Sequence, residues 1–180
     1  MVERGELDRC GQALREGQEV SSRNPSLPAV GTPAPDFTLS STTGSDVTLS
    51  SLRGKNVLLA FFPSAFTSVC TQEMCSLTED YGRFRDANTE ILPISVDSVP
   101  TLREFKAKER LTVELLSDFK REVSRRYGTL NEERFLSKRA YVLIGPEGLV
   151  RWTYEEETPG TRRQNEELLA QVMETHQRSA

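Results

Sequence analysis

An apolar run of six residues, 57–62, followed by a stretch of helical character, restricts the fold of this chain more than any other feature. The run predicts a buried strand, and the pattern after it predicts a helix over residues 67–86. Cys70 would then lie in the first turn of the helix, where unpaired backbone N–H groups and the helix dipole favour a thiolate. A second thiol, Cys75, follows five residues later. This layout is typical of a redox-active cysteine with a candidate resolving partner.

The rest of the pattern alternates strands and helices and then ends on a hairpin and a helix. The alternation predicts parallel strands joined by crossover helices, and the final hairpin adds antiparallel strands. We therefore expect an α/β fold in which helices cover both faces of a central mixed sheet, with a short hairpin at its N-terminal end. The expected strands are 37–39, 47–49, 57–62, 91–96, 141–144 and 149–154, with an extended piece at 112–116.

The helices are predicted from capping residues and apolar periodicity. Ser98 is placed to cap the helix 98–110, with Pro100 tolerated in its first turn. Another helix is expected over 119–127, and a closing amphipathic helix over 161–175. In the closing helix we expect four residues to face inward: Leu168, Leu169, Val172 and Met173.

The N-terminal 29 residues differ from the rest of the chain. Residues 1–29 are polar and end in a Ser- and Pro-containing stretch that reads as a linker. A single folded domain is expected over residues 30–180, long enough to bury a core without disulfide support. Cys10 lies in the extension, where we expect no catalytic role.

The charge balance argues against several classes of partner. The chain has 27 acidic and 23 basic residues, a net charge of −4. This balance favours neither nucleic acid nor an anionic membrane surface. The longest apolar run is too short to span a bilayer, and residues 1–18 contain no apolar segment of the secretory type. A cytoplasmic protein is expected.

Cysteine and histidine content excludes other kinds of site. Three cysteines are an odd number, unlike a secreted disulfide framework. The single histidine, His176, lies five residues from the C-terminal end, where we expect a solvated side chain. A zinc site with histidine, a Ser-His-Asp triad or a Cys-His protease site would each need a placed imidazole. No metal ion, haem or flavin is expected.

The chain resembles the peroxiredoxin family. Pro63-x-x-x-Thr67-x-x-Cys70 is similar to the family's active-site motif, and five further segments match in family order across residues 30–151. These segments are Gly31-Thr-Pro-Ala-Pro-Asp-Phe-Thr-Leu39, Leu49-Ser-Ser-Leu-Arg-Gly-Lys55, Ile94-Ser-Val-Asp-Ser98, Leu116-Ser-Asp118 and Arg139-Ala-Tyr-Val-Leu-Ile144. The resemblance implies a thioredoxin-like fold and a thiol-dependent peroxidase that acts on hydrogen peroxide and organic hydroperoxides.

The resemblance also implies roles for individual residues. Cys70 would be the nucleophile, oxidised to a sulfenic acid. A helix N-terminus stabilises an anion by ~0.3–1 kcal/mol, whereas a guanidinium at ~4 Å and an effective dielectric constant of ~20 contributes about 4 kcal/mol before desolvation. An arginine is therefore expected, and Arg139 is the family's candidate. Thr67 would bond the thiolate and the peroxide, Pro63 would shield the thiolate from water, and Glu73 would orient polar groups nearby.

Cys75 decides between two subfamilies. The run from Thr67 to Cys75 is most similar to the bacterioferritin-comigratory (Q-type) subfamily, in which the second cysteine is the resolving thiol. Ser64-Ala-Phe-Thr67 is also similar to a one-cysteine bacterial (E-type) subfamily that lacks the second cysteine, and Gly145 stands where the family commonly has Asp. On an ideal helix the Cα atoms of Cys70 and Cys75 are about 8.6 Å apart, beyond the ~7 Å that a disulfide tolerates. Resolution by Cys75 would therefore require the helix to unwind.

Three functional hypotheses follow from the residues and the resemblance. In the first, Cys75 resolves Cys70, and thioredoxin or a similar dithiol recycles the enzyme as a monomer or homodimer. In the second, Cys75 is idle and an external thiol completes a one-cysteine cycle. In the third, the chain is a redox sensor or holdase that uses the oxidation of Cys70 to switch a partner. Steady-state turnover distinguishes the enzymes from the sensor.

Overall fold

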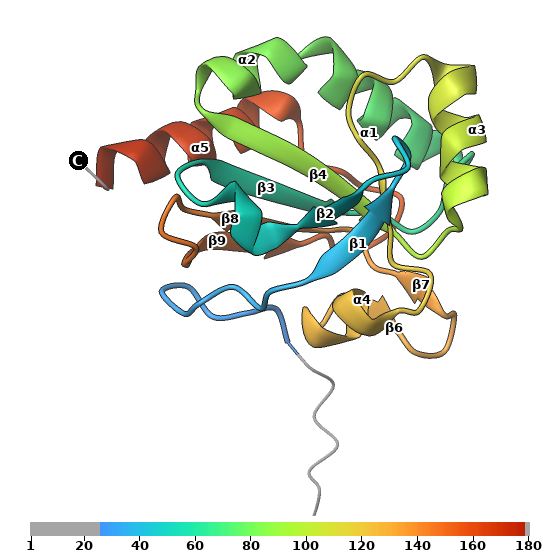
Figure 1. Cartoon of the computed structure of the whole chain (residues 1–180), viewed down its shortest axis with the longest axis horizontal. Helices are drawn as coiled ribbons and strands as arrows, with labels where there is room; N and C mark the ends of the chain where they lie inside the picture. The colour runs from blue at the N-terminus through green and yellow to red at the C-terminus, as the bar shows by residue number, and fades with distance from the viewer. Residues whose placement is uncertain (1–25, 179–180) are drawn as a thin grey trace, which may run out of the picture.

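The computed structural model describes residues 26–178 of the chain (Figure 1). Residues 1–25 and 179–180 lie outside the described part, which leaves out Cys10 and most of the predicted 1–29 extension. The side chains of residues 176–178 are not described either, so the prediction for His176 stays a prediction. Within the described residues, no helix combines the length and the apolar character needed to cross a membrane.

A seven-stranded mixed sheet forms the centre of the molecule, in the order β2-β1-β5-β4-β3-β8-β9. Strand β3 pairs in parallel with β4 and antiparallel with β8, and β4 pairs in parallel with β5. β1 pairs antiparallel with β2 and with β5, so the predicted N-terminal hairpin joins the mixed sheet through β1. The strands are β1 (Thr38–Ser41), β2 (Asp46–Thr48), β3 (Asn56–Phe61), β4 (Thr89–Ser95), β5 (Leu116–Ser117), β8 (Ala140–Ile144) and β9 (Val150–Glu155).

Side-chain alternation along β3 divides the core into two layers. Successive side chains of β3 point to opposite faces of the sheet. Every residue of β3 is buried, because both faces are covered. Leu58 and Ala60 join the cluster that contains residues of α1, α2, α3 and α5, whereas Leu59 and Phe61 join the cluster that contains residues of η1 and α4. The helices are α1 (Ser68–Glu79), α2 (Tyr81–Asp86), α3 (Val99–Glu109), α4 (Glu122–Arg126) and α5 (Asn165–Arg178), with the 3₁₀ helix η1 (Leu49–Leu52).

Helices therefore cover both faces, as predicted, but unequally. Figure 1 shows α1, α2 and α5 together on one side of the sheet and the short α4 on the other. On the α4 side, the segment around Ala34 and Phe37 fills much of the remaining space. α1 begins just beyond the carboxyl end of β3, which is where ligands bind in many α/β sheets.

The predicted helix 67–86 is wrong in one respect, because it is two helices. Asp80 separates α1 from α2 with φ −95° and ψ 5°. Its carboxylate accepts hydrogen bonds from Arg83 Nη1 (3.1 Å) and from Asn165 Nδ2 (2.8 Å). One partner is local and the other comes from α5, and together they hold the short acidic side chain of a residue type that favours helix ends over helix interiors.

Two further elements are shorter than expected. Of the extended piece predicted over 112–116, only Leu116 lies in a strand; with Ser117 it forms β5, which pairs with β4 and β1. The helix predicted over 119–127 begins only at Glu122, because Arg121 adopts a left-handed conformation (φ 62°). The Asp118 carboxylate then accepts from the backbone N–H groups of Val123 (3.2 Å) and Ser124 (2.6 Å) and caps the helix.

In the closing helix, one of the four residues predicted to face inward is exposed. Leu168, Leu169 and Val172 are buried, but Met173 is 54% exposed. At about 100° per residue, Met173 lies about 40° beyond Leu169, which is already at the edge of the apolar stripe. The helix also begins at Asn165 rather than at residue 161.

A second small hairpin was not predicted. It joins β6 (Leu130–Asn131) to β7 (Leu136–Ser137) in a separate two-stranded sheet. Asn131 Oδ1 accepts from the backbone N–H groups of Glu133 (3.1 Å) and Arg134 (2.9 Å) and closes the turn. The hairpin leads directly into Arg139 and β8, so it stands beside the candidate site.

Candidate active site

The loop between β3 and α1 fixes where the helix begins. Ala65 N–H donates to Asp97 Oδ2 (2.8 Å), which ties the loop to the end of β4. Phe66 has a left-handed backbone (φ 64°), and its ring packs on Phe105 at 5.1 Å between centroids. Thr67 then takes the extended N-cap conformation. Cys70 is therefore the third residue of α1, within the first turn, as predicted.

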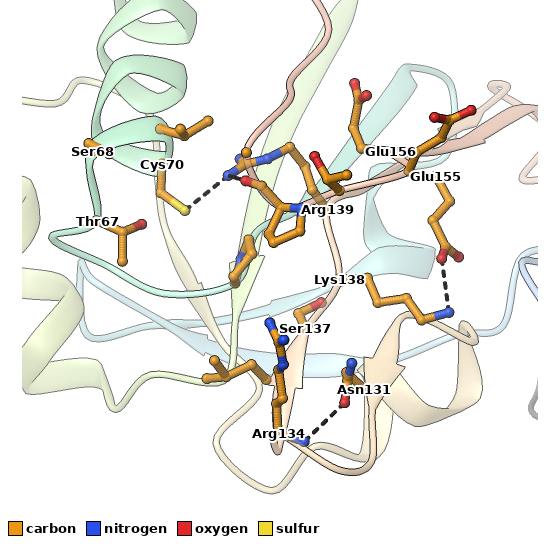
Figure 2. A pocket seen from close by; sticks show the side chains of 17 residues that line it. Thr67, Ser68, Cys70, Asn131, Arg134, Ser137, Lys138, Arg139, Glu155 and Glu156 are labelled. Atoms are coloured by element: carbon orange, nitrogen blue, oxygen red, sulfur yellow. Dashed lines mark hydrogen bonds and ion pairs between the residues drawn. The ribbon is translucent and has the colours of Figure 1, made fainter.

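Arg139 and Cys70 meet below the start of α1. Both side chains are 1% exposed, and Arg139 Nη2 lies 3.2 Å from Cys70 Sγ (Figure 2). The same nitrogen donates to the Pro159 carbonyl oxygen (3.2 Å), which belongs to the β9–α5 loop. A guanidinium at this distance stabilises a thiolate much more than it stabilises a thiol.

Glu73 holds the other side of the guanidinium. It lies one turn after Cys70, on the same helix face, and its Oε2 accepts from Arg139 Nη1. Burial raises the pKa of the Glu73 carboxyl, and the Arg139 charge and the Tyr141 hydroxyl act against this increase. Arg139 is thus fixed between a thiol and a carboxyl group, in a fork geometry that lysine lacks.

Tyr141 has a contact that the sequence did not reveal. Its buried hydroxyl donates to Glu73 Oε1 (2.5 Å) and accepts from Arg163 N–H (3.2 Å). Burial and the neighbouring Glu73 raise the pKa of Tyr141, so the hydroxyl keeps its proton. The available signal was its spacing of two from Arg139, since residues i and i+2 of an extended segment share a face.

The hydroxyl of Thr67 points elsewhere than expected. Thr67 Oγ1 donates to the Ser64 carbonyl oxygen (3.0 Å) and makes no cap bond to the helix, so the expected bond to Cys70 is not formed. With its proton engaged, the oxygen keeps lone pairs that can accept a hydrogen bond. Pro63 is half-buried and forms part of the pocket wall.

The structure does not bring Cys75 to Cys70. Both are free thiols in the continuous helix α1, and Cys75 is half-buried against the core. Burial, followed by the nearby charges of Glu109 and Glu79, raises the pKa of the Cys75 thiol. In this state Cys75 is a protonated thiol facing away from the site.

A pocket of about 510 Å³ opens over Cys70 and Arg139. Its walls come from the start of α1, the β6–β7 hairpin and the loop that follows β9 (Figure 2). The hairpin contribution was missed at the sequence level, although the polar run 131–134 between Leu130 and Leu136 is a turn signal. Wall residues outside the predicted set include Asn131, Arg134, Leu136, Ser137, Lys138, Glu155, Glu156 and Pro159.

The model of the AhpC/TSA family matches residues 30–153 of the chain. The chain belongs to the AhpC/TSA family of peroxiredoxins. Alkyl hydroperoxide reductase E of Mycobacterium tuberculosis is 39% identical over 137 residues, which cover 74% of this chain and 89% of that protein. The human mitochondrial thioredoxin-dependent peroxide reductase is 32% identical over 130 residues, which cover 66% of this chain. Those residues span only 51% of the human protein.

A solved structure agrees with this assignment. The reduced 2-Cys peroxiredoxin of Plasmodium vivax superposes with a TM-score of 0.76 and 31% identity, covering 84% of this chain and 85% of that one. The predicted family, the enzyme class and the thioredoxin-like fold of this peroxiredoxin are therefore confirmed. The Q-type subfamily stays a prediction.

Proposed function

We propose that this peroxiredoxin reduces hydrogen peroxide and organic hydroperoxides at Cys70. The observation that carries the proposal is the 3.2 Å contact between Arg139 Nη2 and Cys70 Sγ at the first turn of α1, beneath an open pocket. The Cys70 thiolate attacks one peroxide oxygen, an S–O bond forms and the O–O bond breaks. Cys70 is oxidised to a sulfenic acid, and the leaving oxygen takes a proton to become water or an alcohol.

In this proposal the neighbours of Cys70 stabilise charge and hold geometry. Arg139 stabilises the thiolate and then the negative charge that develops on the peroxide oxygens. Thr67 Oγ1 accepts a hydrogen bond from the peroxide O–H, because its own proton is donated to the Ser64 carbonyl oxygen. Pro63 has no backbone N–H to bind water, and its ring forms a part of the pocket wall that shields the thiolate from solvent. Glu73 fixes the orientation of the Arg139 guanidinium toward Cys70 and the peroxide.

Cys75 then resolves the sulfenic acid. Its thiolate attacks Cys70 Sγ, the S–S bond forms, and hydroxide leaves and takes up a proton as water. Because both cysteines lie in intact α1, the first turns must unwind before the sulfur atoms can meet. A thioredoxin-like dithiol reduces the exposed disulfide, in keeping with the name of the human relative.

A one-cysteine cycle is the second candidate, and the position of Cys75 favours it. Cys75 is turned from the site, and its raised pKa keeps it protonated while α1 is intact. In that cycle an external thiol attacks the Cys70 sulfenic acid, and a second thiol then releases Cys70. The similarity of Ser64-Ala-Phe-Thr67 to the one-cysteine (E-type) subfamily agrees with this alternative.

Steady-state turnover with NADPH, thioredoxin reductase and thioredoxin tests the proposal. We expect the wild type to consume hydrogen peroxide over many cycles, Cys70→Ser to be inactive, and Cys75→Ser to be inactive with thioredoxin. A Cys75→Ser variant that turns over at the wild-type rate would establish the one-cysteine cycle instead. A wild type that reacts only once per chain with every reductant tried would indicate a sensor.

A further inference from the structure

The pocket over Cys70 is much larger than hydrogen peroxide needs. A water molecule takes about 30 Å³ of liquid volume, and hydrogen peroxide about twice that. The pocket holds about 510 Å³, and part of its wall is apolar, from Pro63, Val69, Leu136 and Pro159. Space and surface of this kind fit the organic part of a hydroperoxide.

Three cations line the pocket, and two of them are already engaged. Arg139 is held by Glu73, Cys70 and Pro159. Lys138 Nζ pairs with Glu155 Oε1 at 2.9 Å. Among the residues that the structure describes, the guanidinium of the third, Arg134, has no hydrogen-bond or ion-pair partner; only its backbone N–H is bonded, to Asn131. Figure 2 shows the Arg134 side chain rising from the hairpin toward the space that Cys70 and Arg139 share.

Acidic residues line the opposite wall, and two of the three are also engaged. Besides Glu155, the half-buried Glu156 forms an ion pair with Arg163, with Oε1 3.9 Å from Nε. Glu157 is exposed in the β9–α5 loop. The unpaired positive charge of the pocket, Arg134, therefore belongs to the β6–β7 hairpin, whereas the acidic residues belong to β9 and the loop after it.

We propose that Arg134 makes this pocket selective for organic hydroperoxides that carry an anionic group such as a carboxylate. The inference rests on the proposed peroxidase function and adds the class of substrate. A guanidinium binds a carboxylate through two parallel N–H···O bonds, which fixes orientation as well as affinity. The apolar wall receives the carbon skeleton, and the peroxide group reaches the Cys70 thiolate.

Rapid-mixing measurement of the second-order rate constant for Cys70 oxidation tests this inference. The probes are cumene hydroperoxide with a para carboxylate, the methyl ester of the same compound, and hydrogen peroxide. For the wild type we expect the acid to react about fivefold faster than the ester, near the upper limit for an exposed ion pair, and the ratio to fall with added salt. For Arg134→Gln we expect a ratio near one, with the hydrogen peroxide rate unchanged.

Further variants separate local from general effects. Arg134→Lys keeps the charge and retains part of the preference, whereas Glu157→Gln raises it. Arg85→Gln removes an equal charge from α2, outside the pocket, and leaves the ratio as in the wild type. Equal rates for acid and ester in the wild type, or a preference that survives Arg134→Gln, would overturn the inference. Failure of hydrogen peroxide itself to react would instead overturn the proposed function on which it rests.

Discussion

Arg139 contacts three groups from two segments that lie far apart in the sequence. Its guanidinium contacts the Cys70 thiol on α1, the Glu73 carboxyl one turn later and the Pro159 carbonyl of the β9–α5 loop. Three directions of contact require the planar fork of arginine. Removing the guanidinium would also leave the buried Glu73 without its cation.

We predict that Arg139→Lys lowers the rate constant for hydrogen peroxide about 100-fold, because an ammonium group cannot reach Cys70 and Glu73 together. The measurement is the rate of Cys70 oxidation in rapid mixing, with circular dichroism to confirm the fold. Arg85→Lys, an exposed substitution on α2, is the matched control. Retention of the wild-type rate by Arg139→Lys would contradict the role given to the guanidinium.

Glu73 makes the stability of the molecule depend on pH. Burial raises the pKa of its carboxyl above the ordinary value of 4.5, so the folded protein binds this proton more tightly than the unfolded chain does. The resulting stability is fully present below the unfolded pKa and is lost as the pH rises through the higher folded pKa. Gln at the same position does not titrate.

We therefore predict that the wild type loses stability relative to Glu73→Gln as the pH rises from about 4.5 toward neutrality. Urea unfolding of both proteins across that range measures the difference in the free energy of unfolding. A difference that grows in favour of the wild type with rising pH has the wrong sign for a carboxyl with a raised pKa.

At the residue scale, three residues named from the sequence lie in contact in the structure, whereas contacts that depend on packing alone were missed. Cys70, Glu73 and Arg139 come together because a first-turn thiolate needs a nearby cation and a cation needs a counter-charge. The contact of Tyr141 was missed, because its spacing of two from Arg139 indicates a shared face but does not show that its hydroxyl reaches Glu73 on α1. The bond of Thr67 to Ser64 likewise depends on a loop conformation that the motif does not encode.

At the scale of elements, α1 is held unequally along its length. Its last turn is tied to α5, where the buried Asn165 Nδ2 donates to Ser76 O and to Asp80 Oδ2, both at 2.8 Å. Thr78 Oγ1 also accepts from Thr112 N–H (3.2 Å). Unwinding from the N-terminal end that reaches Cys75 therefore also breaks the neighbouring contact between Asn165 and Ser76.

We predict that Asn165→Ala speeds formation of the Cys70–Cys75 disulfide from the sulfenic acid. The substitution removes a buried donor and leaves its acceptors unsatisfied, at a cost of about 1–3 kcal/mol in stability. Because the lost contacts hold only the intact helix, the unwound state becomes more accessible. Stopped-flow fluorescence after a pulse of peroxide measures two phases: the first is oxidation of Cys70 to the sulfenic acid, and the second is formation of the disulfide.

The control for that experiment lies on the same helix. Met173→Ala changes an exposed side chain of α5 and is expected to leave the rate of disulfide formation unchanged. If the disulfide forms no faster in Asn165→Ala than in the wild type, the contacts at the C-terminal end of α1 do not limit unwinding.

Elements with a strong periodic pattern were predicted well, whereas breaks and short hairpins were not. The strands β3, β4, β8 and β9 and the Ser98-capped α3 agree with their patterns to within a few residues. The break at Asp80 was missed because it depends on Asn165, a residue from α5. The two-residue strands β6 and β7 are too short to show any period.

At the scale of the whole molecule, oxidation and folding are coupled in the proposed cycle. Unwinding the first turns of α1 separates Cys70 from Arg139, breaks the Glu73 contacts and exposes Met74, which is fully buried. The disulfide form is therefore a partly unfolded molecule whose sheet remains intact.

We predict faster amide hydrogen exchange across residues 68–75 in the disulfide form than in the reduced form, with unchanged protection in β3, β4 and β8. Mass spectrometry of peptic peptides from both forms measures this difference. Equal protection of α1 in the two forms would mean that the cysteines join without unwinding the helix, contrary to the geometry of α1.

In the proposed cycle Cys70 reacts with the peroxide and Cys75 completes the reaction within the same chain. The experiment that tests this cycle is a measurement of intact mass after one equivalent of hydrogen peroxide, with the remaining thiols then blocked. We predict a loss of about 2 Da in the wild type, mapped to a Cys70–Cys75 bridge, and a sulfenic acid on Cys70 in Cys75→Ser. Oxidised Cys70 beside a free Cys75 in the wild type would contradict the intramolecular cycle, and an unreacted Cys70 would contradict the peroxidase itself.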